Sequence, residues 1–515
     1  MKNYKKNYLK SFFLLGAILT ITSCSESFLS EDPDTFVSPP LLLVNEAGAQ
    51  TYLNGAYDAV QQSIAPTGGS NPAPWSIYWG TTAADEVVFP NWGGERKLIY
   101  LHQVTPTTGA INQAWVKYYE SLNRINSVVD RVGAMSSDQI DSDLKNQYVA
   151  EAKFLRTTVN FALVSSWENI PLMKNEVITL ENINVTQAAP SEVYDFMVAD
   201  LISALPYLPT EQGGGRVTAG AANALLGKIY LQMTGFPLNQ TDKFPLAEQA
   251  LKKVMDSGVY DLLPDYASIF DLDNEQSQEM IFAISLDGPA LGEGGLLGFF
   301  FGPQGSVQNG GGWGTCHVNH SFADSYDIDT DVRMINNIAR HNANNTDPET
   351  AVTDETSWTV GKDTWRGWKW HAESPNGYAN DSPFDYPYIR YADVLLLYAE
   401  ALNGQNKLTQ GVIDNTVNRL RTRAGLSTAD MMTLGSQEDN ATELLSERRK
   451  ELCFEGWRRN DLIRFGKYAE SISGITQGGP NAGDPITQYE DFEIRWPIPD
   501  AQMQLNPNLI QNPGY

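Results

Sequence analysis

Tryptophans in glycine-rich and asparagine-rich loops are the residues of this chain whose types and spacing best suggest a chemistry. The 515-residue sequence holds 12 tryptophans. Trp92 follows Asn91 and precedes two glycines, and Trp313 lies in the glycine-dense segment 288–314. Segments of this composition cannot easily bury an indole by themselves, so we expect both rings to be exposed. An indole is a large, rigid, apolar plate, and such a plate can stack on the C–H face of a sugar ring.

Other aromatic residues could belong to the same site. Trp75 and Tyr78 precede the Trp92 loop, and Trp365 and Trp368 lie in a polar, loop-like segment at 357–371. The predicted sugar-contacting residues are therefore Trp75, Tyr78, Asn91, Trp92, Trp313, Trp365 and Trp368, with Asn91 and also Asp85 and Glu95 as polar partners for hydroxyl groups. The alternative for each ring is packing, because most tryptophans in proteins are largely buried. Trp115, Trp457 and Trp496 lie inside regular blocks, and we assign them to the core.

No catalytic or metal-binding motif stands out. A glycosidase needs two carboxylates that flank a cleft, and 62 acidic residues leave many possible pairs, but no recognisable glycosidase motif is present. Four aspartates between Asp324 and Asp331 alternate like a calcium loop, yet the glycine and closing glutamate of an EF-hand are missing. The segment Cys316–His320 has zinc donors in one short cluster without a second pair. We therefore expect no cofactor and no metal.

Helical periodicity identifies the elements that must position these loops. Apolar residues recur every three or four positions from Tyr388 to Asn403, which predicts an amphipathic helix. A second helix at 409–424 would pack against it as an antiparallel pair. Similar patterns predict helices at 46–61, 111–132, 141–164, 191–205 (with Ser191 as N-cap), 218–233 and 246–257. Paired helices with small residues at close contacts are typical of tetratricopeptide-like arrays.

The segment 258–387 has a different texture. Helical periodicity fades there, glycine and aromatic residues become frequent, and only Met280–Leu286 reads as a strand. Long loops without secondary structure of their own often carry function. Further on, the block Glu447–Gly466 is rich in arginine and glutamate, and we predict that these charges form structural ion pairs beneath the helices.

The N-terminus reads as a bacterial lipoprotein signal. Four lysines precede a short apolar run that ends at Ile21-Thr22-Ser23-Cys24, which predicts removal of residues 1–23 and lipidation of Cys24. Residues 24–40 would then be a tether. The formal net charge of −26 argues against nucleic acid as a partner. Cys316 and Cys453 are too few for a disulfide framework; Cys453 is most simply a small core residue, although a bridge between the two is possible.

Five blocks in the C-terminal quarter resemble, in order, those of the SusD/RagB family of nutrient-binding surface lipoproteins of Bacteroidetes. They are YIRYADVLLLYAEALN (388–403), VNRLRTRAGL (417–426), ERRKELCFEGWRRNDLIRFG (447–466), WPIP (496–499) and NPNLIQNPGY (506–515). The resemblance implies an α+β fold that is predominantly α-helical, with a tetratricopeptide-like scaffold of helix pairs and an irregular, loop-rich ligand-binding half. Its N-terminal helical part would span 41–257. Its C-terminal part would span 258–515, with ligand loops at 258–387 and helix pairs and the tail at 388–515.

The resemblance also implies a function. A protein of this family would sit on the outer membrane, held there by its lipid and exposed at the cell surface. It would bind oligosaccharide or polysaccharide without catalysis and deliver it to a SusC-like TonB-dependent transporter. Two alternatives stay open: the same fold serving the import of peptides, and a surface hydrolase.

Overall fold

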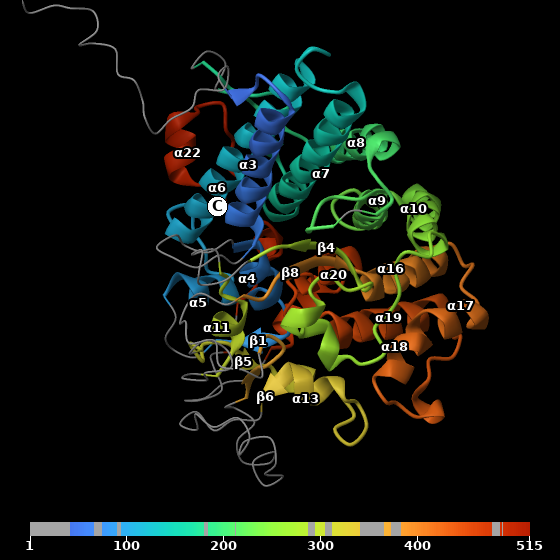
Figure 1. The fold of residues 1–515 in the computed structure, drawn as a ribbon. Coiled ribbons are helices and arrows are strands. Elements are labelled where there is room, and N and C mark those ends of the chain that lie inside the picture. Colours follow the sequence, from blue (N-terminus) through green and yellow to red (C-terminus); the bar gives the residue numbers. More distant parts are fainter. Residues whose placement is uncertain are drawn as a thin grey trace, which may run out of the picture.

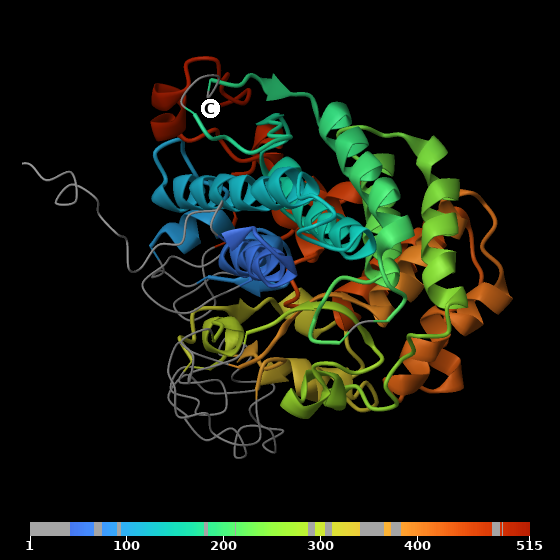
Figure 2. The same ribbon diagram turned by 45° about the horizontal axis from the view of Figure 1, so that its top comes forward.

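The structure, a computed structural model, describes most of the chain beyond the N-terminal segment. The described residues are 42–65, 75–89, 94–179, 184–211, 213–286, 294–303, 312–339, 365–371, 383–475, 485–486 and 488–515. Among them no helix is both long and apolar enough to cross a membrane. Figure 1 shows long helices at the top and right and short strands and helices below, and the tilted view in Figure 2 keeps this division. The fold is therefore predominantly helical with a small β component.

The N-terminal part of the scaffold is a series of long helices in which each packs against the next. They are α3 (Glu46–Ile64), α6 (Gly109–Ser127), which a π-helical turn η2 (Val128–Val132) extends, α7 (Ser142–Trp167), α8 (Pro190–Ala204), which ends in η3 (Leu205–Tyr207), α9 (Ala219–Thr234) and α10 (Phe244–Asp256). The side chains of Asn45, Asp141 and Thr218 cap α3, α7 and α9. The predicted helices are all present. Ser191 is not an N-cap, however, because Pro190 at the first turn starts α8 one residue earlier.

The C-terminal helices continue the array. They are α16 (Tyr391–Gly404), α17 (Gln410–Asn415), α18 (Val417–Arg423), α19 (Gln437–Glu451), α20 (Arg458–Arg464), α21 (Tyr468–Ser473) and α22 (Asp500–Leu505). Helix α16 packs between α10 and α19, so it joins the two parts of the scaffold (Figure 1). The predicted helix at 388–403 begins only at Tyr391, because the residues before it form a strand. The helix predicted at 409–424 is broken at Thr416, whose φ of −126° and ψ of −88° are not helical.

The β structure is short and antiparallel. Its strands are β1 (Val87–Val88), β2 (Ile170–Pro171), β3 (Gln187–Ala188), β4 (Met280–Ile284), β5 (His317–Val318), β6 (Ile338–Ala339), β7 (Arg366–Gly367) and β8 (Tyr386–Arg390). One four-stranded sheet has the order β1-β5-β7-β6, and two further pairs join β4 to β8 and β2 to β3. Short helices accompany the strands in the chain: α4 (Trp75–Thr82), α5 (Glu95–Tyr100), α11 (Leu297–Phe301), α12 (His320–Ala323), α13 (Arg333–Asn337), η5 (Ala267–Phe270) and η6 (Leu272–Asn274). The strand expected at 280–286 is confirmed.

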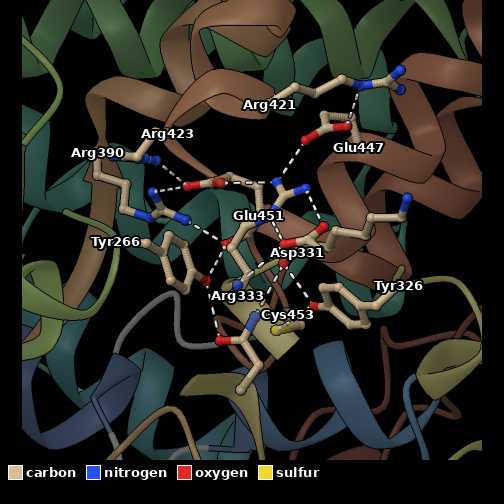
Figure 3. A network of polar contacts seen from close by, with 12 residues as sticks. Tyr266, Tyr326, Asp331, Arg333, Arg390, Arg421, Arg423, Glu447, Glu451 and Cys453 are labelled. Atoms are coloured by element: carbon tan, nitrogen blue, oxygen red, sulfur yellow. Dashed lines mark hydrogen bonds and ion pairs between the residues drawn. The ribbon is translucent and has the colours of Figure 1, made fainter. Parts of the chain in front are cut away.

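Buried ion pairs join the C-terminal helices to the rest of the chain, as Figure 3 shows. Glu451, at the end of α19, is fully buried and contacts Arg390 at 2.8 Å, Arg423 at 2.5 Å and Arg333 at 3.2 Å. Burial alone would raise the pKa of this carboxyl, but the three guanidinium groups together hold it well below its ordinary range. The charges of Glu451 are therefore compensated inside the core, and the predicted structural ion pairs are confirmed.

The same pattern extends across the C-terminal half. Further buried pairs are Arg333–Glu447, Arg333–Asp331, Arg390–Glu279, Arg390–Glu455, Lys369–Glu455, Arg448–Asp393, Arg448–Asp461 and Arg464–Glu400. The segment 447–466 is not one continuous helix: it is interrupted between α19 and α20, where Phe454 and Gly456 have positive φ. Cys316 and Cys453 are both buried and free, so the possible bridge between them is absent. Trp115, Trp457 and Trp496 lie in the core, as expected.

Helix α4 packs closely on the turn before α20 through a contact between two glycines. A Cβ atom added to Gly80 would lie 2.0 Å from the carbonyl oxygen of Gly456. We expect Gly80→Ala to destabilise the protein by about 1–3 kcal/mol, since the backbone must shift to admit the methyl group. Gly55 in α3 is the matched control, because the nearest atom to its added Cβ is 4.0 Å away. Gly55→Ala should be neutral or stabilising by up to about 1 kcal/mol. Urea unfolding of both variants measures this, and equal stability of the two would contradict the close packing.

Candidate functional site

At one end of its strands, the four-stranded sheet brings four segments together that are far apart in the sequence. In the antiparallel register, Val88 pairs with His317, His317 with Arg366, and Ile338 with Gly367. The C-terminal ends of β1 and β7 therefore lie at the same end of the sheet as the N-terminal ends of β5 and β6. We call this end of the sheet the loop edge. The segments that meet the sheet there are 89, 312–316, 368–371 and 333–337. Adjacent strands are about 4.8 Å apart, so the loop edge is on the order of 14 Å long.

Trp313 is held at the loop edge by backbone hydrogen bonds to α11. The backbone N–H of Trp313 donates to the Phe299 carbonyl at 2.8 Å, and the backbone N–H of Gly314 donates to the Gly302 carbonyl at 3.0 Å. Gly312 has a φ of +43°, and a Cβ there would lie 1.9 Å from the Pro303 carbonyl oxygen, so glycine is required at this approach. The flanking glycines thus let the segment run close against α11, and the indole that it carries is half-buried.

The indole of Trp313 has aromatic and cationic neighbours. Phe299 meets it edge-on with 4.9 Å between ring centroids, and the guanidinium carbon of Arg96 lies 4.3 Å above its ring. Arg96 belongs to α5 (Glu95–Tyr100), which begins three residues after Trp92 in the sequence. A half-exposed aromatic plate beside a multiple N–H donor can both stack on an apolar ring face and donate hydrogen bonds to hydroxyl groups. Sequence reasoning missed Arg96, and only its proximity to the Trp92 loop could have indicated it.

A buried aromatic layer lies beneath Trp313. Phe300 contacts Trp313 with 6.1 Å between centroids, and the ring of Tyr78 lies 3.8 Å from that of Phe300. Phe89 lies within 6.4 Å of Phe300. Tyr78 is 1% exposed, and burial raises the pKa of its hydroxyl far above the ordinary value. Tyr78 packs beneath the candidate site and is too buried to contact a ligand, so the prediction that it does so is wrong.

The structure also places the remaining predicted residues. Trp365 is fully buried and Trp368 is 7% exposed, so neither presents an open ring face, and both predictions are corrected. Trp75 is the first residue of α4, and its side chain lies outside the described part of the chain. Asn91 and Trp92 also lie outside the described residues; the chain is described up to Phe89 and again from Gly94.

The two acidic residues considered as hydroxyl partners have structural roles. Asp85 is buried and accepts hydrogen bonds from the Arg458 guanidinium at 2.7 and 2.9 Å. Glu95 accepts the backbone N–H groups of Gly109 and Ala110 at 2.8 and 2.7 Å, which stabilises the start of α6. In the described part of the chain, no group of three or more histidine, cysteine or acidic residues is placed to hold a metal ion.

Glu86, which precedes β1, gives a pH-dependent prediction. Its carboxylate is buried and accepts the Phe454 N–H at 3.3 Å, and burial raises its pKa to about 8 despite the nearby Arg458. The folded state thus binds a proton that the unfolded state releases between about pH 4.5 and 8. The protonated Glu86 carboxyl therefore contributes to the free energy of unfolding at low pH. As the pH rises through this window, the free energy of unfolding falls by up to about 1.4 kcal/mol per pH unit.

We expect Glu86→Gln to gain stability relative to the wild type as the pH rises from 5 to 8, since the neutral amide never ionises. Urea unfolding at several pH values measures the difference. Glu120→Gln is the control, because this glutamate is exposed on α6, and its difference from the wild type should vary little with pH. A flat difference for Glu86→Gln as well would mean that Glu86 titrates normally.

Comparison with known proteins identifies relatives along almost the whole chain. Residues 278–515 match the SusD family, and residues 48–231 match a family described as starch-binding and associating with the outer membrane. The SusD-like protein P2 of Formosa agariphila is 25% identical over 99% of this chain and 100% of its own length. The starch-binding protein SusD of Bacteroides thetaiotaomicron is 25% identical over 80% of each chain.

Solved structures share the fold. A SusD homolog from Bacteroides thetaiotaomicron superposes with a TM-score of 0.76 at 24% identity, over 94% of this chain and 100% of its own. A laminarin-binding SusD-like protein gives a TM-score of 0.71 at 24% identity, over 92% of this chain and 100% of its own. The overall fold is thus shared with these solved structures.

Proposed function

The chain belongs to the SusD/RagB family, and from this premise we propose that it is a non-catalytic protein that binds oligosaccharide or polysaccharide at the loop edge. The observation that carries the proposal is Trp313, a half-exposed indole held rigidly against α11 with the Arg96 guanidinium 4.3 Å above its ring. The sugar stacks on the part of the indole that Arg96 leaves open, and Arg96 donates to its hydroxyl groups.

We extend the site to the segment that carries Asn91 and Trp92. The described residues on either side of it, Phe89 and Gly94, belong to the same corner of the molecule, because Phe89 packs near Phe300 and Gly94 starts the helix of Arg96. Trp92 would add a second stacking plate and Asn91 an amide for hydroxyl groups. Relatives whose names record starch or laminarin as ligands support a glycan over another ligand class.

The proposed route of the glycan continues from the cell surface into the cell. The lipidated Cys24 would anchor the chain to the outer membrane, and the tether would hold the binding face outward. A SusC-like TonB-dependent transporter would receive the glycan. Contacts from a few aromatic plates give modest affinity, which suits a ligand that must be released into a pore.

Affinity electrophoresis tests the binding. Residues 25–515 would be run through native gels that contain starch, laminarin, and further plant, host and microbial polysaccharides. We expect retardation by at least one glycan and no shortening of that glycan after incubation with the protein. Retardation by none would overturn the glycan proposal and favour peptides. Shortening that a carboxylate variant abolishes would instead identify a hydrolase.

Lipidation gives a separate expected result. Cys24→Ser in the full chain should abolish incorporation of labelled palmitate and move the protein from the membrane fraction to the soluble fraction, because the cysteine is the only predicted attachment point for lipid. Cys316→Ser is the control, since this buried cysteine lies far along the chain. Unchanged palmitate labelling of Cys24→Ser would contradict the anchor.

A further inference from the structure

A pocket opens at the other end of the loop edge from Trp313. It has a volume of about 460 Å³, within the range of small-ligand sites. Its wall on the sheet side comes from Asn336, two residues before β6, and from Lys369 and His371, just after β7. The opposite wall comes from η5 and η6. We call it the Asn336 pocket. In Figure 1, α13 and β6, which border it, lie in the same lower part of the molecule as β5 and α11.

The floor and walls of the Asn336 pocket are rigid. The buried Lys369 donates to Glu455 at 2.7 Å and to the Glu451 carbonyl at 3.1 Å, and its ammonium lies 4.7 Å from the Phe270 ring. His371 stacks on Trp368 with 4.5 Å between centroids and 18° between planes. Glu455 also pairs with Arg390, so the buried ion pairs of the C-terminal half hold Lys369 in place at the pocket. A preorganised wall of this kind favours binding, because little ordering remains to be done when the ligand enters.

Asn336 is the group in this pocket that points to a ligand. Asn336 is 9% exposed, and among the residues that the structure describes its buried amide nitrogen has no hydrogen-bond partner. A buried donor without an acceptor is unfavourable. An acceptor on a molecule in the pocket, such as a hydroxyl oxygen, would satisfy it.

The rim of the pocket supplies hydrogen-bond acceptors, whereas Asn336 supplies a donor. Asp265, Asp271 and Asp273 are exposed there, and their carboxylates accept hydrogen bonds. Some of their oxygens already serve local turns: Asp265 accepts the Ser268 N–H and Asp271 the Asp273 N–H. The second oxygen of each carboxylate can accept from a ligand. The described residues hold no metal cluster, and the carboxylates together with the net charge of −26 disfavour an anion.

We propose that the Asn336 pocket binds one uncharged sugar unit and acts as a second subsite of the loop edge. The rim carboxylates accept from its hydroxyl groups, the Asn336 amide donates to one of its oxygens, and His371 contacts its apolar face. This inference rests on the proposed glycan function. It adds that a single glycan chain lies along the loop edge from the Trp313 end to the β6 end, so that specificity depends on both ends.

Saturation-transfer NMR tests the subsite with small probes. The methyl glycosides of glucose, galactose, mannose and xylose would each be added at millimolar concentration to residues 25–515. We expect transfer to at least one glycoside that persists in Trp313→Ala and falls at least threefold in the double variant Asp271→Ala, His371→Ala. The double variant changes rim side chains rather than the buried Asn336, so the fold should survive. Asn336→Leu, checked for folding, should give the same loss.

The control is the matched pair Asp256→Ala, Lys252→Ala, an exposed ion pair on α10, which should leave transfer unchanged. No transfer to any glycoside, or transfer insensitive to the pocket variants, would overturn the subsite. Stronger transfer to lysine methyl ester than to every glycoside would assign the pocket to a basic ligand and also overturn it. Polysaccharide retardation of the wild type reports separately on the proposed function, so failure of one is distinguishable from failure of the other.

Discussion

Trp313→Ala is expected to weaken glycan binding by about thirtyfold, which corresponds to roughly 2 kcal/mol. The indole is the described aromatic plate that is both rigidly held and half-exposed at the loop edge. Its removal takes away the stacking surface and leaves Arg96 without the ring beneath it. Isothermal titration with an oligosaccharide prepared from the glycan that retards the wild type measures the change. Trp313→Phe should retain part of the affinity.

Tyr207→Ala is the matched control for this experiment. Tyr207 lies in η3 on the helical scaffold and is 50% exposed, so its removal takes away an aromatic surface remote in sequence from the loop edge. We expect unchanged affinity. If Trp313→Ala folds normally and binds as tightly as Tyr207→Ala, the sugar does not stack on Trp313.

Glu451→Gln is expected to destabilise the protein by about 3–5 kcal/mol, the cost of removing one partner from a buried ion pair. The variant leaves Arg390, Arg423 and Arg333 with less negative charge in a fully buried environment. Urea unfolding followed by circular dichroism measures the loss. Because the pKa of Glu451 is lowered in the folded state, the advantage of the wild type should persist down to about pH 4.5 and decline only below it.

Glu438→Gln is the control, since Glu438 lies exposed in the first turn of the same helix, α19. It should cost less than about 1 kcal/mol, the range of a charge at a helix N-terminus. Equal losses for the two variants would show that the buried network adds no stability of its own.

The sequence predicted the scaffold well because each long helix carries its own periodic apolar face. It failed where tertiary contacts decide the local structure. Residues 388–390 continue the apolar pattern of the following helix, yet they pair with β4 as strand β8. The break at Thr416 and the interruption around Phe454 also have no strong local signal. Helix ends depend on such contacts more than on propensity.

The candidate site was only partly predictable for a similar reason. A glycine-rich context predicted an exposed Trp313, but its indole is half-buried, because Phe299 and Arg96 from other segments pack against it. A polar context misled for Trp365, which is fully buried. Its carbonyl accepts the Val318 N–H, and β7 after it pairs with β5 and β6, which are contacts with distant segments that local composition does not reveal. Asn336 gave no signal, and Arg96 gave only its proximity to the Trp92 segment, since the significance of each arises from contacts between segments far apart in the sequence.

A crystal structure of residues 25–515 with the oligosaccharide that retards the protein is the most direct test of glycan binding at the loop edge. We predict a sugar ring stacked on the indole of Trp313, with the Arg96 guanidinium within hydrogen-bonding distance of a hydroxyl group. A glycan bound elsewhere, such as along the helices α8–α10 with the loop edge empty, would contradict the account.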